Sequence, residues 1–296
     1  MPELTIQAPG KINLHLRVKG TRPDGYHDLE SVFLALNFGD TLRVRLLDEP
    51  ETTDIRVSGT GFSPPEENII YKAVSLFRAE TGFNRGLRVD VEKRIPLGGG
   101  MGGGSSDAAS ALLALNDLAG TGLSAARLGK MAGTLGSDVP FFLTGGAAWV
   151  SGRGENIQPL PDFPDFPVAL VNPGFSSGTA GAFRLLDASR LSGASLGPVE
   201  GPAPEVYMKA LGENPRNWPF WNDFLPALDP ETGGVYSRIL SRLKGLGADF
   251  SGLSGAGSTC FGVFGDGEKA EKAVKILEME WPFVQLTAIL LLENFR

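Results

Sequence analysis

The strongest chemical signal in the sequence is a glycine-rich tract at residues 98–104, in which Met101 is the one position that is not glycine. Glycine lets the backbone approach a ligand closely and adopt positive φ angles. The alanine- and leucine-rich segment that follows predicts a helix, with Ser105 or Ser106 as its N-cap and Gly120 as its stop. Free N–H groups and the positive end of the helix dipole would then face the tract. This combination predicts an anion site, for which phosphate is the common occupant.

The familiar phosphate-binding motifs do not account for this tract. Gly98 to Gly103 match G-x-G-x-x-G formally, but in so glycine-rich a stretch the match carries little information. A dinucleotide-binding fold would also place this turn early in a repeated βαβ pattern. Gly99 and Gly104 have the spacing of a P-loop, but Ser105 stands where that motif requires lysine. A flexible linker is the remaining alternative, and the strand and helix patterns on either side disfavour it.

The elements that would position this tract follow from the hydrophobic pattern. Strict alternation predicts half-buried strands at residues 12–18, 42–46 and 87–91. Asn68 can cap a helix over residues 69–77. Further patterns predict helices at 124–136, 235–243 and 268–277, strands at 261–264 and 286–292, and an irregular loop at 191–204. Helices that alternate with strands favour an α+β sandwich.

A proline-rich segment at residues 159–167 has the composition of a linker. A chain of 296 residues is about two domains long. We therefore predict an N-terminal domain at residues 1–158, which contains the glycine-rich tract, and a C-terminal domain at residues 159–296.

The composition excludes several classes of protein. The hydrophobic fraction of 42% and the charged fraction of 21% are those of an ordinary soluble globular protein, and the net charge of −7 argues against a nucleic-acid partner. A single cysteine, Cys260, and two histidines, His15 and His27, disfavour a disulfide framework and a histidine-rich metal site. The first residues lack the pattern of a signal peptide, and the apolar runs are shorter than the roughly 18 residues of a membrane helix. We therefore expect a cytoplasmic protein without a membrane partner.

Three motifs in the same order resemble those of the GHMP kinase superfamily, small-molecule kinases named after galactose, homoserine, mevalonate and phosphomevalonate kinases. The first motif, P-x-K-[IL]-N-L, corresponds to residues 9–14, and the second, which is glycine-rich, to residues 96–106. The third is the glycine-rich turn at residues 254–258. The resemblance covers residues 9–264 and is weakest between residues 185 and 236. It implies an N-terminal nucleotide-binding α+β domain and a C-terminal α/β sandwich of ferredoxin-like type, with the active site in the cleft between them.

Three segments narrow the resemblance to one branch of this superfamily, namely RPDGYH at residues 22–27, the doubled form GGGMGGGSS at residues 98–106, and GSDVPFF at residues 136–142. That branch acts in the non-mevalonate route to isoprenoid precursors. The implied reaction transfers the γ-phosphoryl group of ATP, with Mg²⁺, to the 2-hydroxyl of a methyl-branched sugar alcohol. This small-molecule substrate carries a cytidine diphosphate group.

The resemblance implies that Asp138 is the base that accepts the hydroxyl proton and that Lys11 lies beside it. A lysine there would lower the carboxylate pKa, stabilise the forming alkoxide and attract the γ-phosphate. Asn13 points to the same side of the strand as Lys11 and could bind substrate or orient Asp138. Without the resemblance, a solvated or capping aspartate and a solvated strand lysine would be the simpler interpretations.

The resemblance also implies an ATP site along the second motif, with Ser105 and Ser106 near the β-phosphate or its Mg²⁺. No protein ligand of the metal can be assigned, because Asp107 is equally explained as a charge that complements the helix dipole. Asn68 resembles a family position near adenine, and a plain N-cap role is equally consistent with it. The predicted ATP-binding residues are Asn68, Pro96, Leu97, Gly98, Gly99, Gly100, Met101, Gly102, Gly103, Gly104, Ser105 and Ser106.

The predicted substrate-reading residues follow from the same resemblance. Tyr26 and Phe183 are expected to face each other across a planar base, and His27 to offer backbone and ring groups to a cytosine edge. An ordinary core position is the simpler alternative for Phe183. The predicted substrate-binding residues are Asn13, Tyr26, His27, Thr179, Phe183, Gly255, Ala256 and Gly257.

Two other functions remain open from the sequence. One is a GHMP kinase for another alcohol, such as a mevalonate-like substrate, and the other is a non-catalytic nucleotide- or sugar-binding relative. The presence of both Lys11 and Asp138 disfavours the second. We expect a monomer or a weak homodimer.

Overall fold

The computed structural model describes residues 1–58, 67–161, 164–193 and 202–291. The chain folds as two compact units. Unit 1 consists of residues 1–10, 38–95 and 102–145, and unit 2 of residues 11–37, 96–101 and 146–296. Because these units interleave along the chain, the division into consecutive domains at residues 158 and 159 stays a prediction.

Two long strands, β1 (Glu3–Thr21) and β2 (His27–Pro50), contribute residues to both units. They confirm the strands expected at residues 12–18 and 42–46. The prediction that the first of these is half-buried is wrong, because Lys11, Asn13 and His15 are as buried as the apolar residues between them. These three residues therefore have protein partners, whereas Lys19, further along the same face, is exposed.

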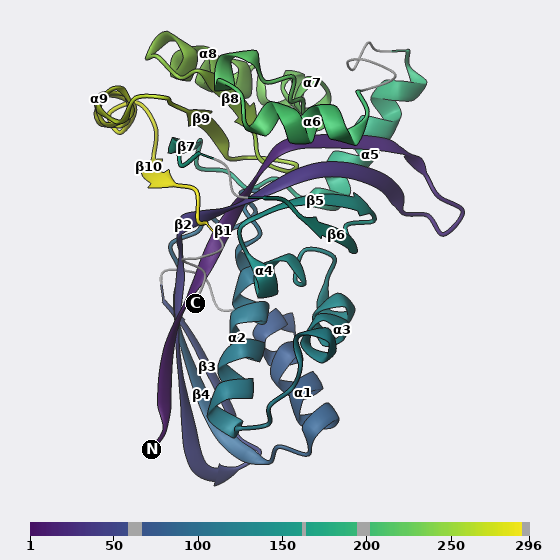
Figure 1. The fold of residues 1–296 in the computed structure, drawn as a ribbon, viewed down its shortest axis with the longest axis vertical. Helices are drawn as coiled ribbons and strands as arrows, with labels where there is room; N and C mark the ends of the chain where they lie inside the picture. The colour runs from purple at the N-terminus through teal and green to yellow at the C-terminus, as the bar shows by residue number, and fades with distance from the viewer. Residues whose placement is uncertain (59–66, 162–163, 194–201, 292–296) are drawn as a thin grey trace. The chain divides into compact units, whose positions relative to one another are not determined.

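Unit 1 packs helices against a sheet (Figure 1). Its strands are β3 (Thr53–Ser58), β4 (Arg85–Glu92) and parts of β1 and β2. β4 lies between β3, to which it is parallel, and β2, to which it is antiparallel. The helices are α1 (Ile69–Thr81), α2 (Gly103–Ala119), α3 (Ala125–Leu135) and α4 (Phe141–Thr144). β4 confirms the strand predicted at residues 87–91.

The helix ends in unit 1 follow the sequence with one exception. The side chain of Asn68 accepts a hydrogen bond from Ile70 N at 2.8 Å, as predicted, and that of Ser124 caps α3 where a helix start was predicted. Gly120 ends α2 in the left-handed conformation, with φ of 62°. The prediction of a serine cap for α2 is wrong, because the N-cap is Gly102, with φ of 71°. Ser105 and Ser106 consequently lie inside the helix.

Unit 2 contains a four-stranded antiparallel sheet of ferredoxin-like topology. Its strands β7 (Pro167–Asn172), β8 (Phe250–Leu253), β9 (Cys260–Val263) and β10 (Phe283–Ala288) have the order β10-β7-β9-β8. Helices connect β7 to β8 and β9 to β10, which is the β-α-β-β-α-β pattern. Separately, β5 (Ala147–Gly152) pairs with β2 and with β6 (Asn156–Pro159).

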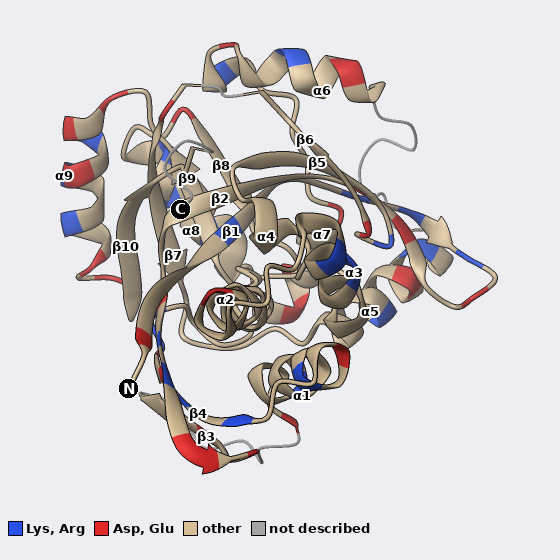
Figure 2. Ribbon diagram, turned by 60° about the horizontal axis from the view of Figure 1, so that its bottom comes forward, with Lys and Arg blue, Asp and Glu red and all other residues tan. Residues whose placement is uncertain are grey.

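The helices of unit 2 cover this sheet and the β1–β2 hairpin. They are α5 (Thr179–Leu191), α6 (Pro204–Leu211), α7 (Phe224–Leu228), α8 (Val235–Gly245) and α9 (Gly267–Leu277), with short 3₁₀ turns at Pro215–Asn217 and Pro230–Thr232. α8 packs on β8 and β9, and α9 on β7 and β10. The buried side of α9 is apolar, whereas its other side carries the lysine and glutamate residues coloured in Figure 2.

The remaining predictions for this half of the chain are largely confirmed. α8, α9 and β9 lie where helices at 235–243 and 268–277 and a strand at 261–264 were predicted. β10 ends at Ala288, so the strand predicted at residues 286–292 is confirmed only at its start, and residue 292 lies outside the described residues. Residues 194–201, which form most of the loop predicted at 191–204, also lie outside the described residues. In the part of the chain that the structure describes, no helix is long and apolar enough to span a membrane.

A buried histidine gives unit 2 a pH-dependent stability. The His15 ring stacks on Tyr207 with ring centroids 4.2 Å apart, and its Nδ1 accepts a hydrogen bond from Trp221 N at 3.2 Å. Burial, together with the nearby Arg17, lowers the pKa of His15 to about 4. Below its ordinary pKa of 6.5 the unfolded chain therefore takes up a proton that the folded chain excludes.

We expect His15 to lower the free energy of unfolding by about 1.6 kcal/mol as the pH falls from about 6.5 to about 5. Urea unfolding of the wild type and His15→Gln at both pH values measures this contribution. The variant should lose less stability over this interval than the wild type. Equal losses in the two proteins would contradict the assignment.

Candidate active site

One buried hydroxyl joins the three sequence motifs in unit 2. Ser254 Oγ, from the third motif, donates a hydrogen bond to Gly100 O at 2.9 Å and accepts one from Asn13 N at 3.3 Å. Lys11 N, from the first motif, donates to Met101 O at 3.0 Å. The first half of the glycine-rich tract is thus bonded to both of the other motifs, which lie far from it in sequence.

Close backbone approach explains two glycines of the tract. Gly100 has φ of +76°, and a Cβ atom there would lie 2.1 Å from Ser254 O. A Cβ atom on Gly99 would lie 2.8 Å from Thr259 Oγ1. That hydroxyl is held by Asn172 Nδ2 at 3.0 Å, and Thr259 N donates to Gly99 O at 3.1 Å. The tract therefore has a defined conformation in unit 2, and the interpretation as a flexible linker does not hold.

Lys11 is a fixed, buried cation. Its Nζ donates to Asn13 Oδ1 at 2.5 Å and lies 4.6 Å from the centroid of the Phe33 ring. Asn13 is held in turn by a hydrogen bond from its Nδ2 to Ser31 Oγ at 2.9 Å. Only 4% of the Lys11 surface is exposed, so water screens its charge weakly. The ammonium group is thereby preorganised to stabilise negative charge.

The second half of the tract lies in unit 1 and opens α2. Gly102 is the N-cap, and Ser106 is fully buried in the first turns of the helix. Among the described residues, none forms a hydrogen bond with Ser106 Oγ. Ser105 is half-buried, and Gly104 is exposed. The start of α2 therefore combines free backbone N–H groups with a buried hydroxyl oxygen that can bind a phosphate oxygen or a metal ion.

Asp107 belongs to a buried group of charges that the sequence did not reveal. Lys93 Nζ lies 2.8 Å from Asp107 Oδ2 and also contacts Asp40. Asp40 accepts hydrogen bonds from Arg94 N at 2.6 Å and Ile95 N at 2.8 Å, directly before the tract. Burial raises the pKa of Asp107 to about 7, although the Lys93 ammonium acts in the opposite direction. Asp107 is thus paired with a lysine, in addition to its place near the helix start.

Asp138 lies in unit 1, in the tight turn between α3 and α4. Val139 N donates to Gly136 O at 3.2 Å, and the side chains of Val139, Phe141 and Phe142 are buried. These apolar anchors fix the turn while the Asp138 carboxylate stays half-buried. A carboxylate on a rigid turn with partial access to solvent is suited to accept a proton.

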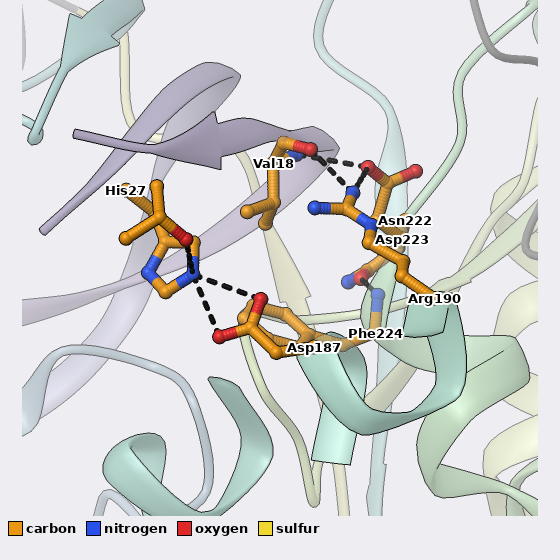
Figure 3. Close-up of polar contacts among 8 residues, drawn as sticks. Val18, His27, Asp187, Arg190, Asn222, Asp223 and Phe224 are labelled. Atoms are coloured by element: carbon orange, nitrogen blue, oxygen red, sulfur yellow. Dashed lines mark hydrogen bonds and ion pairs between the residues drawn. The ribbon is translucent and has the colours of Figure 1, made fainter. Parts of the chain in front are cut away.

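The aromatic arrangement at the predicted base site differs from the prediction. The ring that stacks on Phe183 is His27, with centroids 4.5 Å apart and planes 17° from parallel. Tyr26, which was expected to face Phe183, is 56% exposed, and the Arg153 guanidinium lies 4.7 Å from the centroid of its ring. The neighbouring His27 packs against α5 in place of Tyr26, because β2 begins at His27 and directs its side chain toward that helix (Figure 3).

The other predicted substrate residues lie in unit 2. Thr179 is the first residue of α5 and Phe183 follows one turn later. The third motif is held by Asn222, whose Nδ2 donates to Leu253 O at 2.7 Å and to Gly255 O at 2.9 Å. Ala256 is buried next to it. Asn222 had no signal in the sequence, since it lies in the segment where the resemblance is weakest.

Comparisons with known proteins agree with the motifs. The family GHMP kinases N terminal domain matches residues 68–146, and GHMP kinases C terminal matches residues 208–281. A protein of Treponema pallidum named 4-diphosphocytidyl-2-C-methyl-D-erythritol kinase is 38% identical over 95% of this chain and 97% of its own length. A protein of the same name from Moorella thermoacetica is 36% identical over 98% of this chain and 100% of its own.

Solved structures show the same relationship. A crystal structure of 4-(cytidine 5'-diphospho)-2C-methyl-D-erythritol kinase is 34% identical, with a TM-score of 0.78, and covers 97% of this chain and 99% of its own. Homoserine kinase from Cytophaga hutchinsonii has a TM-score of 0.69 at 16% identity, over 98% of this chain and 95% of its own, and shares the fold.

Proposed function

The chain belongs to the 4-diphosphocytidyl-2-C-methyl-D-erythritol kinases of the GHMP kinase family, and from this premise we propose how its residues carry out phosphoryl transfer. It is an ATP-dependent kinase of isoprenoid precursor biosynthesis, and its acceptor is 4-diphosphocytidyl-2-C-methyl-D-erythritol. The acceptor group we propose is the 2-hydroxyl. The observation that carries the proposed division of roles is the buried Lys11 ammonium, held between Asn13 and Phe33.

Asp138 accepts the proton of the acceptor hydroxyl, and the oxygen then forms a bond to the γ-phosphorus while the bond to ADP breaks. Lys11 stabilises the negative charge that develops on this oxygen and on the transferred group. Asn13 keeps the Lys11 ammonium in place through the 2.5 Å hydrogen bond. Phosphoryl transfer depends mainly on positioning and charge stabilisation, which is what fixed groups of this kind supply.

The glycine-rich tract binds the ATP phosphates through its backbone and the start of α2. The third motif fixes Gly100 and the first motif fixes Met101 through hydrogen bonds. Their backbone is therefore already ordered before ATP binds. Asn68 at the start of α1 contacts the adenine in this proposal, in addition to its role as a cap.

The described residues fit a magnesium ion at one point, the unpartnered hydroxyl oxygen of the buried Ser106. Magnesium prefers oxygen ligands and keeps several water and phosphate ligands in kinases. When bound, it neutralises charge on the ATP phosphates. Ser106 and the substrate phosphates would hold it, while Asp107 is engaged by Lys93.

Phe183, Thr179 and the third motif bind the cytidine diphosphate part of the acceptor in this proposal. Phe183 supplies a ring face for the base, His27 contacts the base edge, and Tyr26 is the exposed aromatic residue of the same hairpin. Gly255, Ala256 and Gly257 form a tight turn that permits close backbone approach to the diphosphate.

Phe183→Ala should raise KM for the cytidine substrate by roughly 5- to 150-fold, because stacking of a base on an aromatic ring contributes about 1–3 kcal/mol. The KM for ATP should stay almost unchanged. Steady-state kinetics with each substrate varied in turn measures both constants. Failure of CMP to compete with the acceptor, or a weakened ATP interaction in the variant, would contradict the assignment of this pocket.

Transfer of radiolabelled phosphate from ATP across a panel of alcohols tests the proposed function directly. The panel includes 4-diphosphocytidyl-2-C-methyl-D-erythritol, mevalonate and homoserine, and the position of the label on the product identifies the hydroxyl. Label on mevalonate alone would indicate a kinase for another alcohol, and no transfer at all would indicate a non-catalytic relative. The predicted monomer or weak homodimer is tested separately by sedimentation.

A further inference from the structure

One face of α5 holds the β1–β2 hairpin. Phe183, Asp187 and Arg190 are spaced four and three residues apart, so they share that face. His27 stacks on Phe183. His27 Nε2 lies 3.0 Å from Asp187 Oδ1 and 3.1 Å from Asp187 Oδ2 (Figure 3). The His27 side chain is 10% exposed, whereas that of Asp187 is 40% exposed. A partner 160 residues away in sequence therefore fixes the imidazole.

A second anchor holds the hairpin independently of Asp187. Arg190 donates to Val18 O and lies 3.2 Å from Asp223 Oδ2. The same carboxylate oxygen accepts a hydrogen bond from Val18 N at 2.9 Å. Both backbone groups of Val18 are thereby bound, as Figure 3 shows. Loss of the Asp187 carboxylate should consequently leave the hairpin docked, which makes a substitution there informative.

The contact with Asp187 has a chemical consequence for the imidazole. An ionised carboxylate can only accept hydrogen bonds, so Nε2 carries a proton, and of the two neutral tautomers the contact selects the one with its proton on Nε2. Thr21 Oγ1 lies 3.4 Å from the same nitrogen. In the described part of the chain, no residue forms a hydrogen bond with His27 Nδ1. The second ring nitrogen is thus left as an acceptor.

We propose that Asp187 is a positioning residue that fixes His27 with Nδ1 as a hydrogen-bond acceptor, and that this favours cytosine over uracil in the acceptor substrate. Cytosine carries an amino donor at C4, where uracil, like thymine, carries a carbonyl acceptor. An acceptor nitrogen accepts a hydrogen bond from the cytosine amino group and repels the uracil carbonyl oxygen. The inference rests on the proposed role of His27 at the base, and it adds that the Asp187 carboxylate determines the tautomer of the His27 imidazole.

Nitrogen-15 NMR of the imidazole rings tests the positioning step. The chain has only two histidines, so few signals need assignment, and His27→Ala identifies those of His27. We expect wild-type His27 in the Nε2–H form, because Asp187 accepts that proton. Asp187→Ala should convert it to a mixture of tautomers and leave the His15 signals in place. An unchanged His27 spectrum in Asp187→Ala would overturn the proposal.

Kinetics test the consequence for the substrate. Asp187→Ala should raise KM for the cytidine substrate severalfold, because only the fraction of molecules in the Nε2–H form then pairs with the base, with kcat and KM for ATP unchanged. The preference in kcat/KM for this substrate over its uracil analogue should fall by a similar factor. Asp28→Ala is the matched control, because it removes a carboxylate from the next residue, where it contacts Arg22 at 2.8 Å. It should change neither quantity.

Two results separate failure of this inference from failure of the proposed base site. If His27→Ala leaves KM for the cytidine substrate unchanged, His27 does not read the base, and the inference fails with that role. If His27→Ala raises KM while Asp187→Ala does not, the base site stands and the positioning role of Asp187 is overturned. A lower KM in Asp187→Ala would show that the contact closes the base site, and it would also overturn the positioning role.

Discussion

Asp138→Asn is expected to lower kcat by about 10²–10⁴-fold, the usual contribution of a general base. The amide keeps the size and shape of the carboxylate, so the turn anchored by Val139 and Phe141 should fold normally. ATP binding should be nearly unchanged, because Asp138 acts on the acceptor hydroxyl in the proposed mechanism. Single-turnover phosphate transfer and ATP titration measure the two effects separately.

Asp117→Asn is the matched control for this substitution. Asp117 is an exposed aspartate in the same unit, on α2, and its replacement removes the same charge. Its kcat should equal that of the wild type. A value of kcat for Asp138→Asn within a few-fold of the wild type would show that another group, or water, accepts the proton.

Lys11→Ala is expected to lower kcat by about 10²–10³-fold, the effect of removing one preorganised group that stabilises transition-state charge. The double variant with Asp138→Asn should lose much less activity than the product of the two single losses, because groups that act as a unit are not additive. The four kcat values of the double-mutant cycle measure this coupling. Since Lys11 also bonds to Asn13 Oδ1, thermal unfolding of each variant should accompany the kinetics.

The control for Lys11→Ala lies on the same strand. Lys19 is a lysine of β1 whose side chain is 52% exposed and pairs with Glu30. Exposed ion pairs contribute little, so Lys19→Ala should keep wild-type kcat. Independent, multiplicative losses for Lys11 and Asp138 would refute the proposal that the two residues act on the same reacting oxygen.

Local patterns in the sequence predicted five of the nine α-helices and five of the ten strands in the part of the chain that the structure describes. The N-cap at Asn68, the helix start at Ser124 and the stop at Gly120 were predicted correctly, because each depends on hydrogen bonds or φ angles within a few residues. The start of α2 was placed wrongly for a related reason. A run of glycines offers several residues that can adopt positive φ, and contacts elsewhere in the fold decide which of them caps the helix.

Pairs of distant residues were beyond the reach of sequence patterns. Lys93 and Asp40 are 53 residues apart, and His27 and Asp187 are 160 apart, and neither pair has a periodicity or a motif. The polar face of β1 was predicted to be exposed to water, because an alternating pattern shows only that one face of a strand is apolar. It cannot show that distant parts of the chain cover the opposite face. Tyr26 and His27 are neighbours, and only the packing of α5 decided which ring meets Phe183.

The sequence by itself determined the chemistry of this protein, because the residue types of the three motifs and their order along the chain are those of the GHMP kinases. The tertiary structure decided how those residues are held. The Ser254 hydroxyl that joins the three motifs, the burial of Lys11 and the carboxylate at His27 all arise from long-range packing. A sequence pattern records the properties of each residue, whereas a contact depends on the free energy of the whole fold that brings two residues together.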